Sequence, residues 1–572
     1  MDEIKLLSTE SRLLRRIVYS VCLATLVAVP VFEAFRGLDV TDMGFVLTNQ
    51  RFVFTHPASV SYWFHLWLTN VVGGVVDLLF GRFGVLPHKL AAAVIFWAMA
   101  ASVFVLYRRS GQRMLVLIGV TVSMAFNFTQ KINIVHYNNL SALLFVLGAA
   151  LLCEGSLSRQ SWLFGLSGLV FALNAFARIP NLAGIGLIFV PAILDLFIPD
   201  PAHKLKVSAM NYMAFLLGVA AAAAVALAAL SLLGHLPYYV QALRDLGNSN
   251  SIDAGSYGVK RVILRPIRDT LFSLGYGAPF AIALALVSAA VSLWKSRFVM
   301  AAGGVAVAVV AYLCIGLPLI RAQLPRATAG LCYWAALAIL FDRRASREIK
   351  LSAVIAACLA LALNLGSDTG IAVSMYVYPA MFPALLYAAR SASGILASRI
   401  ASGYRPMRSL AAVVAALFLG VSIFNIRYGV YRDVQTIHRT VRDPQLAHIF
   451  TSDARAQALE AVLPVIRSYV RPGGELLAYD SLCLIHFATS TLPYLNNPWP
   501  AQYKPSYLDE ALRSKEKHGP LPVVVLARSN PRGSAWPSGT RPPANMEPVH
   551  AFLARNAYHL AWESPAFQIY TP

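Results

Sequence analysis

The sequence predicts an α-helical polytopic membrane protein with a small α/β domain at its C-terminal end. The first observation is composition: 58% of the 572 residues are hydrophobic, only 13% are charged, and the mean hydropathy is +0.60. The second is that several apolar runs reach the roughly 20 residues needed to cross a bilayer. The third is a change of composition after Ile426, beyond which the chain is polar and contains no such run.

The basic residues are best explained by membrane topology. The chain has 48 Lys and Arg against 27 Asp and Glu, a formal net charge of +21. In a soluble protein this excess would suggest nucleic acid, but here the basic residues form short clusters between apolar runs. Such clusters are typical of topology signals and of contacts with anionic lipid headgroups. We therefore expect membrane lipids as partners and, with no nucleic-acid motif in the sequence, no nucleic acid.

The apolar runs predict about 13 transmembrane helices by the length rule. The predicted spans are 17–35, 86–107, 114–128, 136–153, 162–176, 182–197, 210–233, 271–294, 298–320, 327–341, 351–365, 375–389 and 410–426. Basic residues before the first span place the N-terminus in the cytoplasm, so the C-terminus is expected outside. The aromatic stretch 56–84 is predicted to lie on the outer surface, because another span would move the Arg108-Arg109 cluster to the wrong side.

Two domains follow from this pattern. Residues 1–426 form the transmembrane domain, with a first outer loop at 36–85. Residues 427–572 form an extracytoplasmic domain in which predicted strands alternate with predicted helices, a pattern typical of α/β structure. Strands are expected at 474–479, 521–526, 558–562 and 566–570, and helices at 455–469, 507–517 and 549–556.

The first outer loop carries two carboxylates three residues apart, Asp39 and Asp42, in the stretch Gly37-Leu-Asp-Val-Thr-Asp-Met-Gly-Phe45. A carboxylate at the edge of a bilayer is costly unless it is used or paired. The pair could bind a divalent cation such as Mg²⁺ or Mn²⁺, or one carboxylate could act as a general base while the other orients it. The alternative is a helix start, because Thr41-Asp42 precedes a helical run.

Four basic residues are candidates for contact with an anionic ligand. Arg178 lies in an apolar segment, where its planar guanidinium can bind a phosphate, pair internally or reach the interface. Arg321 and Arg326 are positive charges at an outer membrane end, against the charge rule. Lys131, also outside, is weaker evidence, because a lone lysine at the interface is common.

Polar groups at two further outer ends are candidates for contact with a polar substrate. His136, Tyr137 and Asn138 open a predicted span and offer hydrogen-bonding groups near the depth of the acidic loop. The alternative is a polar cap on that helix. Asp368 lies in the flexible stretch Gly366-Ser-Asp-Thr-Gly370, where a capped turn is the competing explanation.

The pattern resembles the GT-C glycosyltransferases, which include protein mannosyltransferases, aminoarabinose transferases and oligosaccharyltransferase catalytic subunits. The resemblance lies in the first loop around Asp39 and Asp42, in the stretch from Leu79-Phe-Gly81 to Tyr107-Arg-Arg109, and in the overall architecture. It implies a polyprenyl-phosphate or polyprenyl-diphosphate sugar donor. It implies that Asp42, in Thr-Asp-Met-Gly-Phe, is the catalytic acid of the first loop and that Asp39 supports it or binds metal. The sequence lacks the adjacent Asp-Glu or Glu-Asp pair that is common in that family.

The sequence therefore predicts an inverting, membrane-embedded hexosyl- or pentosyltransferase. It would transfer a sugar from a polyprenyl-phosphate donor to a lipid, glycan or protein acceptor of the cell envelope, with Asp42 as general base. One alternative is a non-enzymatic transporter or flippase of lipid-linked glycans, although no internal repeat is visible. Another is a glycan ligase or polymerase, which the long outer loop predicted at 235–270 would suit. The expected location is a bacterial inner membrane.

Overall fold

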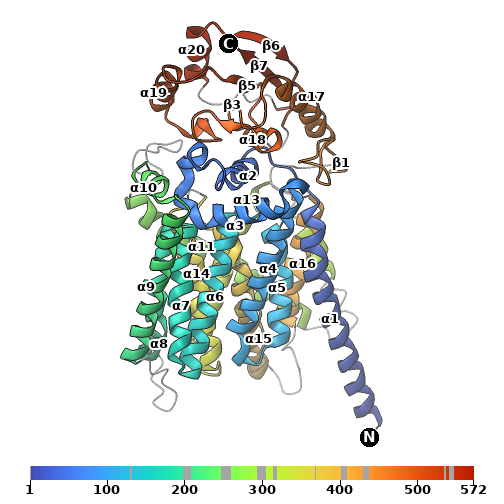
Figure 1. Ribbon diagram of the computed structural model, residues 1–572. Coiled ribbons are helices and arrows are strands. Elements are labelled where there is room, and N and C mark those ends of the chain that lie inside the picture. Colours follow the sequence, from blue (N-terminus) through green and yellow to red (C-terminus); the bar gives the residue numbers. More distant parts are fainter. Residues whose placement is uncertain are drawn as a thin grey trace.

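The computed structural model consists of a helical bundle and a smaller domain that covers one end of it (Figure 1). It describes residues 2–128, 132–197, 208–245, 259–292, 305–313, 318–367, 369–400, 409–428, 437–533, 536–539 and 546–572. Eight helices within these ranges are long and apolar enough to cross a membrane. All of them except Pro57–Phe83 coincide with predicted spans, and the predicted polytopic helical architecture is confirmed.

Every predicted span contains helical residues. The helices of the bundle are α1 Asp2–Ala34, α4 Leu86–Leu106, α5 Arg113–Phe128, α6 Tyr137–Ser158, α7 Ser161–Ala177, η4 Ile179–Phe189 with α8 Val190–Phe197, α9 Ala209–Leu232, α11 Val259–Ser292, residues 305–313, α13 Pro318–Phe341, α14 Arg347–Asn364, η6 Gly370–Val377 with α15 Tyr378–Ile400, and α16 Ser409–Tyr428. Two of the spans begin as 3₁₀ helix, at η4 and η6, each at the end of the bundle beneath the small domain. The boundary predicted at 426/427 falls in the last turn of α16.

The first outer loop is helical and lies across the end of the bundle. It contains α2 (Asp42–Phe52), the 3₁₀ helix η1 (Pro57–Leu66) and α3 (Trp67–Phe80). Figure 1 shows α2 and α3 between the bundle and the small domain, roughly at right angles to the long helices. This arrangement agrees with surface helices at 56–84, although their composition alone would suit a span. We call this end of the bundle the capped end.

The predicted loop 235–270 is largely helical where it is described. Helix α10 (Leu236–Asp245) follows α9 directly, and α11 begins at Val259. The basic residues near the end of this range lie on the first turns of α11. There Arg265 approaches Asp269 at the i,i+4 spacing that stabilises a helix, with a distance of 3.7 Å between Nε and Oδ2.

The C-terminal domain is built on a five-stranded mixed sheet, as the alternating pattern predicted. Its strand order is β4-β3-β5-β7-β6, with β3 parallel to β4 and β5 and the other pairs antiparallel. The strands are β3 Glu475–Tyr479, β4 Leu492–Pro493, β5 Val523–Ala527, β6 His559–Glu563 and β7 Phe567–Thr571, and the helices are α17 Asp453–Tyr469, α18 Cys483–Thr489, α19 Pro505–Glu516 and α20 Glu547–Arg555. The sequence did not predict α18 or β4. Both are shorter than the stretch of sequence over which a periodic pattern of hydrophobic residues can be recognised.

The first outer loop and the C-terminal domain share one hydrophobic core. Leu38, Val40 and Met43 are buried in the same cluster as Leu477 and Val525 of the sheet. A small antiparallel pair, β1 (Arg439–Thr440) with β2 (Phe450–Thr451), extends toward the loop, and Arg36 forms a parallel bridge with Phe450. The loop is therefore a structural part of the C-terminal domain although more than 400 residues separate them in sequence.

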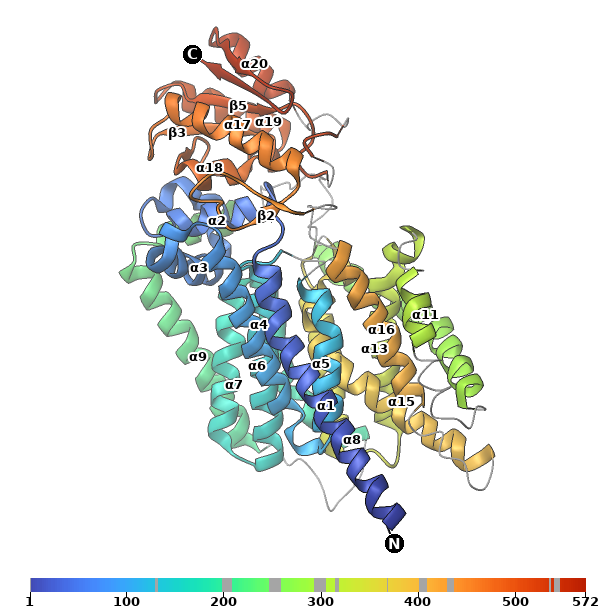
Figure 2. The same ribbon diagram turned by 90° about the vertical axis from the view of Figure 1, so that its right-hand side faces the viewer.

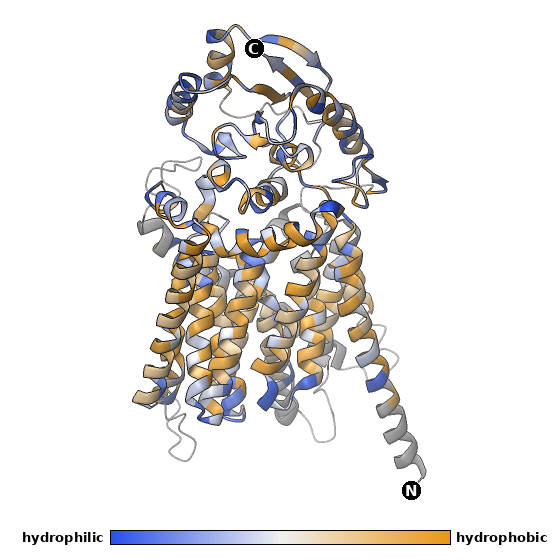
Figure 3. Ribbon diagram, in the orientation of Figure 1, coloured by the Kyte–Doolittle hydropathy of each residue, from blue (hydrophilic) through white to orange (hydrophobic). Residues whose placement is uncertain are grey.

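The two ends of the bundle differ in character. The N-terminus lies at the end opposite the C-terminal domain (Figure 2). That opposite end carries basic clusters with carboxylate partners, as in the bond of 2.6 Å between Arg109 Nη2 and Glu154 Oε1 and the pair formed by Arg347 and Asp195. Figure 3 shows hydrophilic residues at both ends of an otherwise hydrophobic bundle. The distribution is that expected of a helical bundle that crosses a membrane.

Candidate functional site

Asp39 fixes the conformation of the acidic loop. It is 4% exposed, and each of its carboxylate oxygens accepts a hydrogen bond within the loop. Oδ1 accepts from the hydroxyl of Thr41 and Oδ2 from the backbone N–H of Met43, both at 2.9 Å. Thr41, the residue before α2, makes no capping bond with its own side chain. Asp39 therefore supplies the capping hydrogen bond that the sequence suggested for the start of α2. Both oxygens of its carboxylate are bonded to groups of the same loop.

Asp42 is placed differently, at the first position of α2. Its side chain is half-buried, and a carboxylate in the first turn is favoured by the helix dipole. Its charge acts on Tyr376 in η6 and on Cys483 at the start of α18. Burial raises the pKa of the Cys483 thiol, and the carboxylates of Asp42 and Asp39 raise it further. Asp42 thus lies where the bundle, the first loop and the C-terminal domain meet.

The start of α6 contributes to the same place. His136 caps the helix: its Nδ1 accepts from the N–H of Asn138, while the side chain of Asn139 accepts from the N–H of His136 at 2.9 Å. His136 therefore has the alternative role considered for it above, that of a polar cap on the helix. Asn138 is close enough to Tyr376 to hydrogen-bond with it, and the charges of Tyr137 and Asp42 also act on Tyr376. The proposed role of Tyr137 and Asn138 in substrate contact stays a prediction.

A cavity lies directly beneath this group. Its apolar wall comes from one face of α4 and from α6, and its polar groups come from the segment before α6 and from η6. Lining residues are Ala92, Ile95, Phe96, Met99, Ile132, Asn133, Asn139, Ala142 and Tyr376. Because Tyr376 both lines the cavity and lies within the electrostatic range of Asp42, the cavity and the carboxylate belong to one site.

A buried lysine that the sequence analysis did not single out lies on α4, shortly before the residues that line this cavity. Lys89 is 2% exposed and lies one turn before Ala92 on α4, at the spacing that puts both residues on one helix face. Its ammonium donates to the backbone carbonyl of Arg36 at 2.6 Å, and its charge acts on Glu33. The signal available in the sequence was weak, because a lysine near a helix start resembles a residue that reaches the interface.

The arginines chosen from the sequence have other surroundings. Arg178 is 6% exposed and donates to the carbonyls of Leu363 and Leu365, at 2.8 and 2.9 Å, at the C-terminal end of α14. A cation there stabilises the carbonyl end of that helix, which is the internal role left open above. Arg326 is exposed and donates to Gln323 at 3.0 Å.

Three further candidates cannot be placed at the site. Lys131 and Asp368 lie outside the described residues. Arg321 belongs to the first turn of α13, where the structure describes the backbone. The proposed roles of these residues in substrate contact therefore stay predictions.

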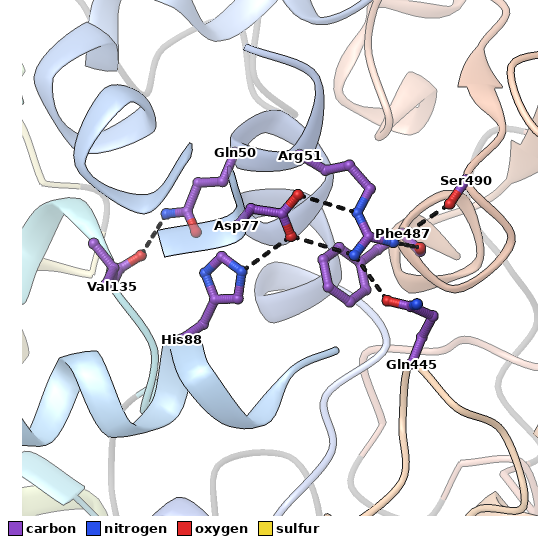
Figure 4. Close-up of polar contacts among 8 residues, drawn as sticks. All are labelled: Gln50, Arg51, Asp77, His88, Val135, Gln445, Phe487 and Ser490. Carbon is purple, nitrogen blue, oxygen red and sulfur yellow. Dashed lines mark hydrogen bonds and ion pairs between the residues drawn. The ribbon is translucent and has the colours of Figure 1, made fainter. Parts of the chain in front are cut away.

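A polar network ties the acidic loop to the C-terminal domain (Figure 4). Arg51, at the end of α2, is bonded to Asp77 of α3 and, on the other side, to the C-terminal domain. There it donates to the carbonyl of Phe487 at 2.5 Å and to Gln445 Oε1 at 2.8 Å. His88 Nε2 lies 3.4 Å from the same carboxylate of Asp77. Arg51 and Asp77 are 10% and 13% exposed, so the network is largely shielded from water.

The metal site suggested for the two loop carboxylates stays a prediction. Each oxygen of Asp39 accepts a hydrogen bond within the loop, and these bonds hold the start of α2. Within the described residues, no group of three or more His, Cys, Asp or Glu side chains is arranged to hold a metal ion. A cation bound by Asp39 or Asp42 would therefore need further ligands from water or substrate.

No protein-family model matches the chain, and no curated protein matches it. Several solved structures align with this chain over most of its length. ArnT from Cupriavidus metallidurans bound to undecaprenyl phosphate aligns over 96% of this chain and 97% of its own, with a TM-score of 0.49 and 12% identity. ArnT from the same organism in the apo state gives a TM-score of 0.47 and 13% identity over the same shares of the two chains.

An archaeal oligosaccharyltransferase gives a comparable match. AglB from Archaeoglobus fulgidus, in complex with an inhibitory peptide and a dolichol-phosphate, aligns over 88% of this chain and 69% of its own. The TM-score is 0.45 and the identity 12%. At this level of similarity, what the chain can do has to be inferred from the geometry of its own site.

Proposed function

We propose that this protein is a membrane-embedded glycosyltransferase that transfers a sugar from a polyprenyl-phosphate donor, with inversion, to an acceptor at the capped end. The observation that supports this most is the position of Asp42. It is a half-buried carboxylate in a loop held by the C-terminal domain, and its charge acts on Tyr376, which lines the cavity. A general base needs such a position: fixed, and next to a space for the reacting group.

The reaction requires little else from the protein. The acceptor hydroxyl oxygen attacks the anomeric carbon as its proton passes to Asp42. The bond between that carbon and the phosphate oxygen breaks, and polyprenyl phosphate leaves. The developing charge on the phosphate needs a cation in a site of low dielectric, and Lys89 is a buried cation on the cavity face of α4. We propose Lys89 in the role that the sequence analysis gave to the arginines.

The basic clusters at the opposite end of the bundle support an orientation. By the charge rule that end faces the cytoplasm, so the capped end and the C-terminal domain face outward. We propose a bacterial inner membrane as the location, with a cell-envelope lipid, glycan or protein as the acceptor. A glycan ligase or polymerase is less well supported, because the described parts of 235–270 are helical.

Transfer assays on purified protein in nanodiscs test the proposal. Wild type, Asp42→Asn and Lys89→Met are given radiolabelled polyprenyl-phosphate sugars and extracted cell-envelope acceptors. Asp509→Asn, a change to a surface carboxylate that pairs with Arg555, serves as the matched control. We expect Asp42→Asn to retain donor binding and lose about 10²-fold or more in kcat, since general bases contribute on that order. Lys89→Met should weaken both donor binding and turnover.

Two outcomes would overturn the proposal. Full activity of Asp42→Asn would show that Asp42 is not the general base and serves only at the start of α2. Movement of lipid-linked glycan across vesicles by the wild type, without any transfer, would make the protein a flippase. The same assay with EDTA and then with Mn²⁺ tests metal dependence, and we expect activity to survive chelation because one general base and a buried cation can support the transfer.

A further inference from the structure

Helix α3 packs on α2 along one of its faces. Gly73 and Gly74 are buried and lie directly against α2. A Cβ added to Gly74 would lie 2.5 Å from a methyl carbon of Val53, the residue that follows α2. Asp77, on the same face of α3, accepts a hydrogen bond from Arg51 of α2 at 3.2 Å. This face of α3 therefore holds the helix that carries the candidate base.

The opposite face of α3 is apolar and exposed. Val75, Leu78 and Leu79 share that face by their i, i+3, i+4 spacing, and the two leucines are 71% and 63% exposed. We call these three residues the apolar face of α3. Phe80, the last residue of the helix, and Phe83, in the 3₁₀ turn η2 that follows, extend it with two half-exposed rings. An apolar patch of this kind marks a surface that contacts protein or lipid.

The depth of this patch follows from the helix that comes next in the chain. Helix α4 has 21 residues from Leu86, so it is about 31 Å long, close to the thickness of the hydrocarbon core. It ends just before Arg108 and Arg109, a basic pair typical of one headgroup layer. Leu86 therefore lies near the other headgroup layer. Phe83 precedes it by three residues, at most about 11 Å of extended chain.

The charges around the patch suit phospholipid. Arg82 of η2 is exposed, and its guanidinium carbon lies 4.7 Å from the centroid of the Phe83 ring. An arginine can bury its stem beside apolar groups while its guanidinium binds a phosphate in the headgroup layer. The one acidic residue of α3, Asp77, faces α2, so no carboxylate of this helix would repel lipid phosphates from the patch.

We infer that the apolar face of α3, together with Phe80, Arg82 and Phe83, is a docking surface for the membrane leaflet at the capped end. The apolar side chains lie among the acyl chains, and the Arg82 guanidinium binds lipid phosphate. Because α3 lies roughly at right angles to the long helices, its whole length stays near the headgroup layer (Figure 1). The leaflet then supports α2 through α3, while the C-terminal domain holds α2 through its contacts with Arg51.

Nitroxide labels on single introduced cysteines locate the apolar face. Full-length Leu79→Cys, Val94→Cys and Leu560→Cys are labelled in nanodiscs, and unaltered protein reports the background from native cysteines, which are buried or half-buried where described. Val94, 57% exposed on the membrane-spanning α4, is the lipid control, and Leu560, 45% exposed on β6, is the water control. We expect the label on Leu79→Cys to resemble that on Val94→Cys. Both should collide more with oxygen, which concentrates in lipid, than with a water-soluble nickel chelate.

Two results would overturn the docking surface. Preferential collision of the Leu79→Cys label with the nickel chelate, as expected for Leu560→Cys, would place the face in water. Protection of that label from both reagents would place the face against protein, either a second copy of this chain or another partner.

Hydrogen exchange in nanodiscs tests the link between the leaflet and α2. The double variant Leu79→Ser, Phe83→Ser removes apolar contact with lipid and changes no residue that packs on α2. We expect the amides of α2 to exchange several-fold faster in this variant than in the wild type. The amides of α20, at the far side of the C-terminal domain, should keep their wild-type rates (Figure 1). Leu560→Ser, a matched change of an exposed leucine on β6, should leave α2 unchanged. Wild-type exchange of α2 in the double variant would overturn the link.

The role of Arg82 is tested by the lipid composition of the nanodiscs. Phosphatidylglycerol in place of phosphatidylcholine should slow the exchange of α2 in the wild type, because a more negative surface holds the guanidinium more strongly. Arg82→Gln should lose this response. An equal response of the two proteins would overturn the assignment of Arg82 to lipid phosphate. None of these measurements uses donor or acceptor, so their results hold whether or not the protein transfers sugar.

Discussion

The guanidinium of Arg51 stacks on the ring of Phe487, with its central carbon 3.7 Å from the ring centroid, although 436 residues separate the two in sequence. The same guanidinium donates to the carbonyl of Phe487 and to the carboxylate of Asp77. Arg51 is the last basic residue of the helix that Asp42 begins. The contact therefore fixes the far end of the helix that carries the candidate base, and it does so through the C-terminal domain.

Replacing Arg51 should loosen the C-terminal domain and disturb the site together. Arg51→Gln leaves the largely buried carboxylate of Asp77 without its guanidinium partner and removes the stacking on Phe487. We expect a loss of about 3 kcal/mol in the free energy of unfolding, as measured for other ion pairs broken on one side in shielded positions. Arg51→Lys should restore only part of this, because an ammonium cannot make the forked contacts.

Thermal unfolding followed by tryptophan fluorescence measures the effect, and Arg513→Gln, which removes an exposed helix pair with Asp509, is the control. The control should change stability by less than about 1 kcal/mol. If Arg51→Gln were as stable as the control, the network would be a surface feature without a role in docking. We expect kcat to fall together with the stability of the C-terminal domain. Contacts with α3 and with that domain both position α2, which carries the candidate base.

At Gly44 the first outer loop and the C-terminal domain approach each other closely. A Cβ added there would lie 2.1 Å from the backbone nitrogen of Leu484, far inside van der Waals contact. That nitrogen donates to the carbonyl of Val40 at 3.0 Å, so the two backbones cannot separate without losing the bond. Gly44→Ala should therefore displace α18 from α2, lower the apparent Tm by several degrees and reduce transfer activity strongly.

Gly275→Ala in α11 is the appropriate comparison, because nothing lies within 4 Å of a Cβ at that position. Alanine has the higher helix propensity, so this control should be neutral or slightly stabilising. Equal Tm values for the two alanine variants would contradict the close approach of α18 and α2.

The sequence was sufficient for what depends on local pattern. Apolar runs and basic clusters are properties of neighbouring residues, so the spans and the strands β3 and β5 could be predicted from them. The prediction of Asp42 as the base also came from local features and from the resemblance. The positions of Arg178 and Lys89 relative to the site could not be predicted, because they depend on helix packing. Arg178 turns to the end of α14, and Lys89 to the loop at Arg36.

The same limit explains why Arg51 and Asn133 were not recognised. Arg51 is one basic residue on a polar helix until Phe487 packs on it from another domain. Asn133 is an ordinary loop residue in the sequence, and only its burial without a hydrogen-bond partner among the described residues marks it as unusual. Both residues are distinguished by whether another group contacts them in three dimensions, and one sequence alone does not reveal such contacts.

Asp39 and Asp42 should respond differently to the same chemical change. In Asp39→Asn the amide oxygen can face the Met43 N–H while the amide NH₂ donates to the Thr41 hydroxyl, which must then accept where it donated before. Two hydrogen bonds to a charged carboxylate become weaker bonds to a neutral amide, so we expect the loop to lose about 1–3 kcal/mol of stability. Asp42→Asn weakens the favourable interaction of that carboxylate with the helix N-terminus, about 0.3–1 kcal/mol.

The two variants are therefore distinguished by measuring stability and activity on the same samples. Asp39→Asn should lower Tm and reduce activity in proportion, and lower temperature should recover part of the activity. Asp42→Asn should keep its Tm and lose activity at every temperature. If Asp39→Asn retained its Tm but lost activity as completely as Asp42→Asn, then Asp39 would take part in the chemistry and the purely structural role would be wrong.

His486 should make the C-terminal domain sensitive to acid. It is fully buried in α18, where its Nδ1 lies 3.3 Å from the hydroxyl of Thr491, and burial lowers its pKa to about 3. Above the ordinary pKa of 6.5 the residue is neutral in both folded and unfolded chains and adds no pH dependence. Between 6.5 and 3, the unfolded chain binds a proton that the folded chain excludes. The free energy of unfolding therefore falls as the pH falls through this window, by at most about 1.4 kcal/mol per pH unit.

Denaturation of wild type and His486→Gln across pH 4 to 8 isolates this contribution, since all other titrating groups are common to both proteins. The difference between their unfolding free energies should be constant above about pH 6.5 and should shift in favour of His486→Gln on acidification. Because α18 packs on α2, acid should also reduce transfer activity less in the variant than in the wild type, once its lower starting stability is taken into account. A difference that is independent of pH would mean that His486 is protonated equally in the folded and unfolded chains, and the loss of the C-terminal domain in acid would then have to arise from its carboxylates.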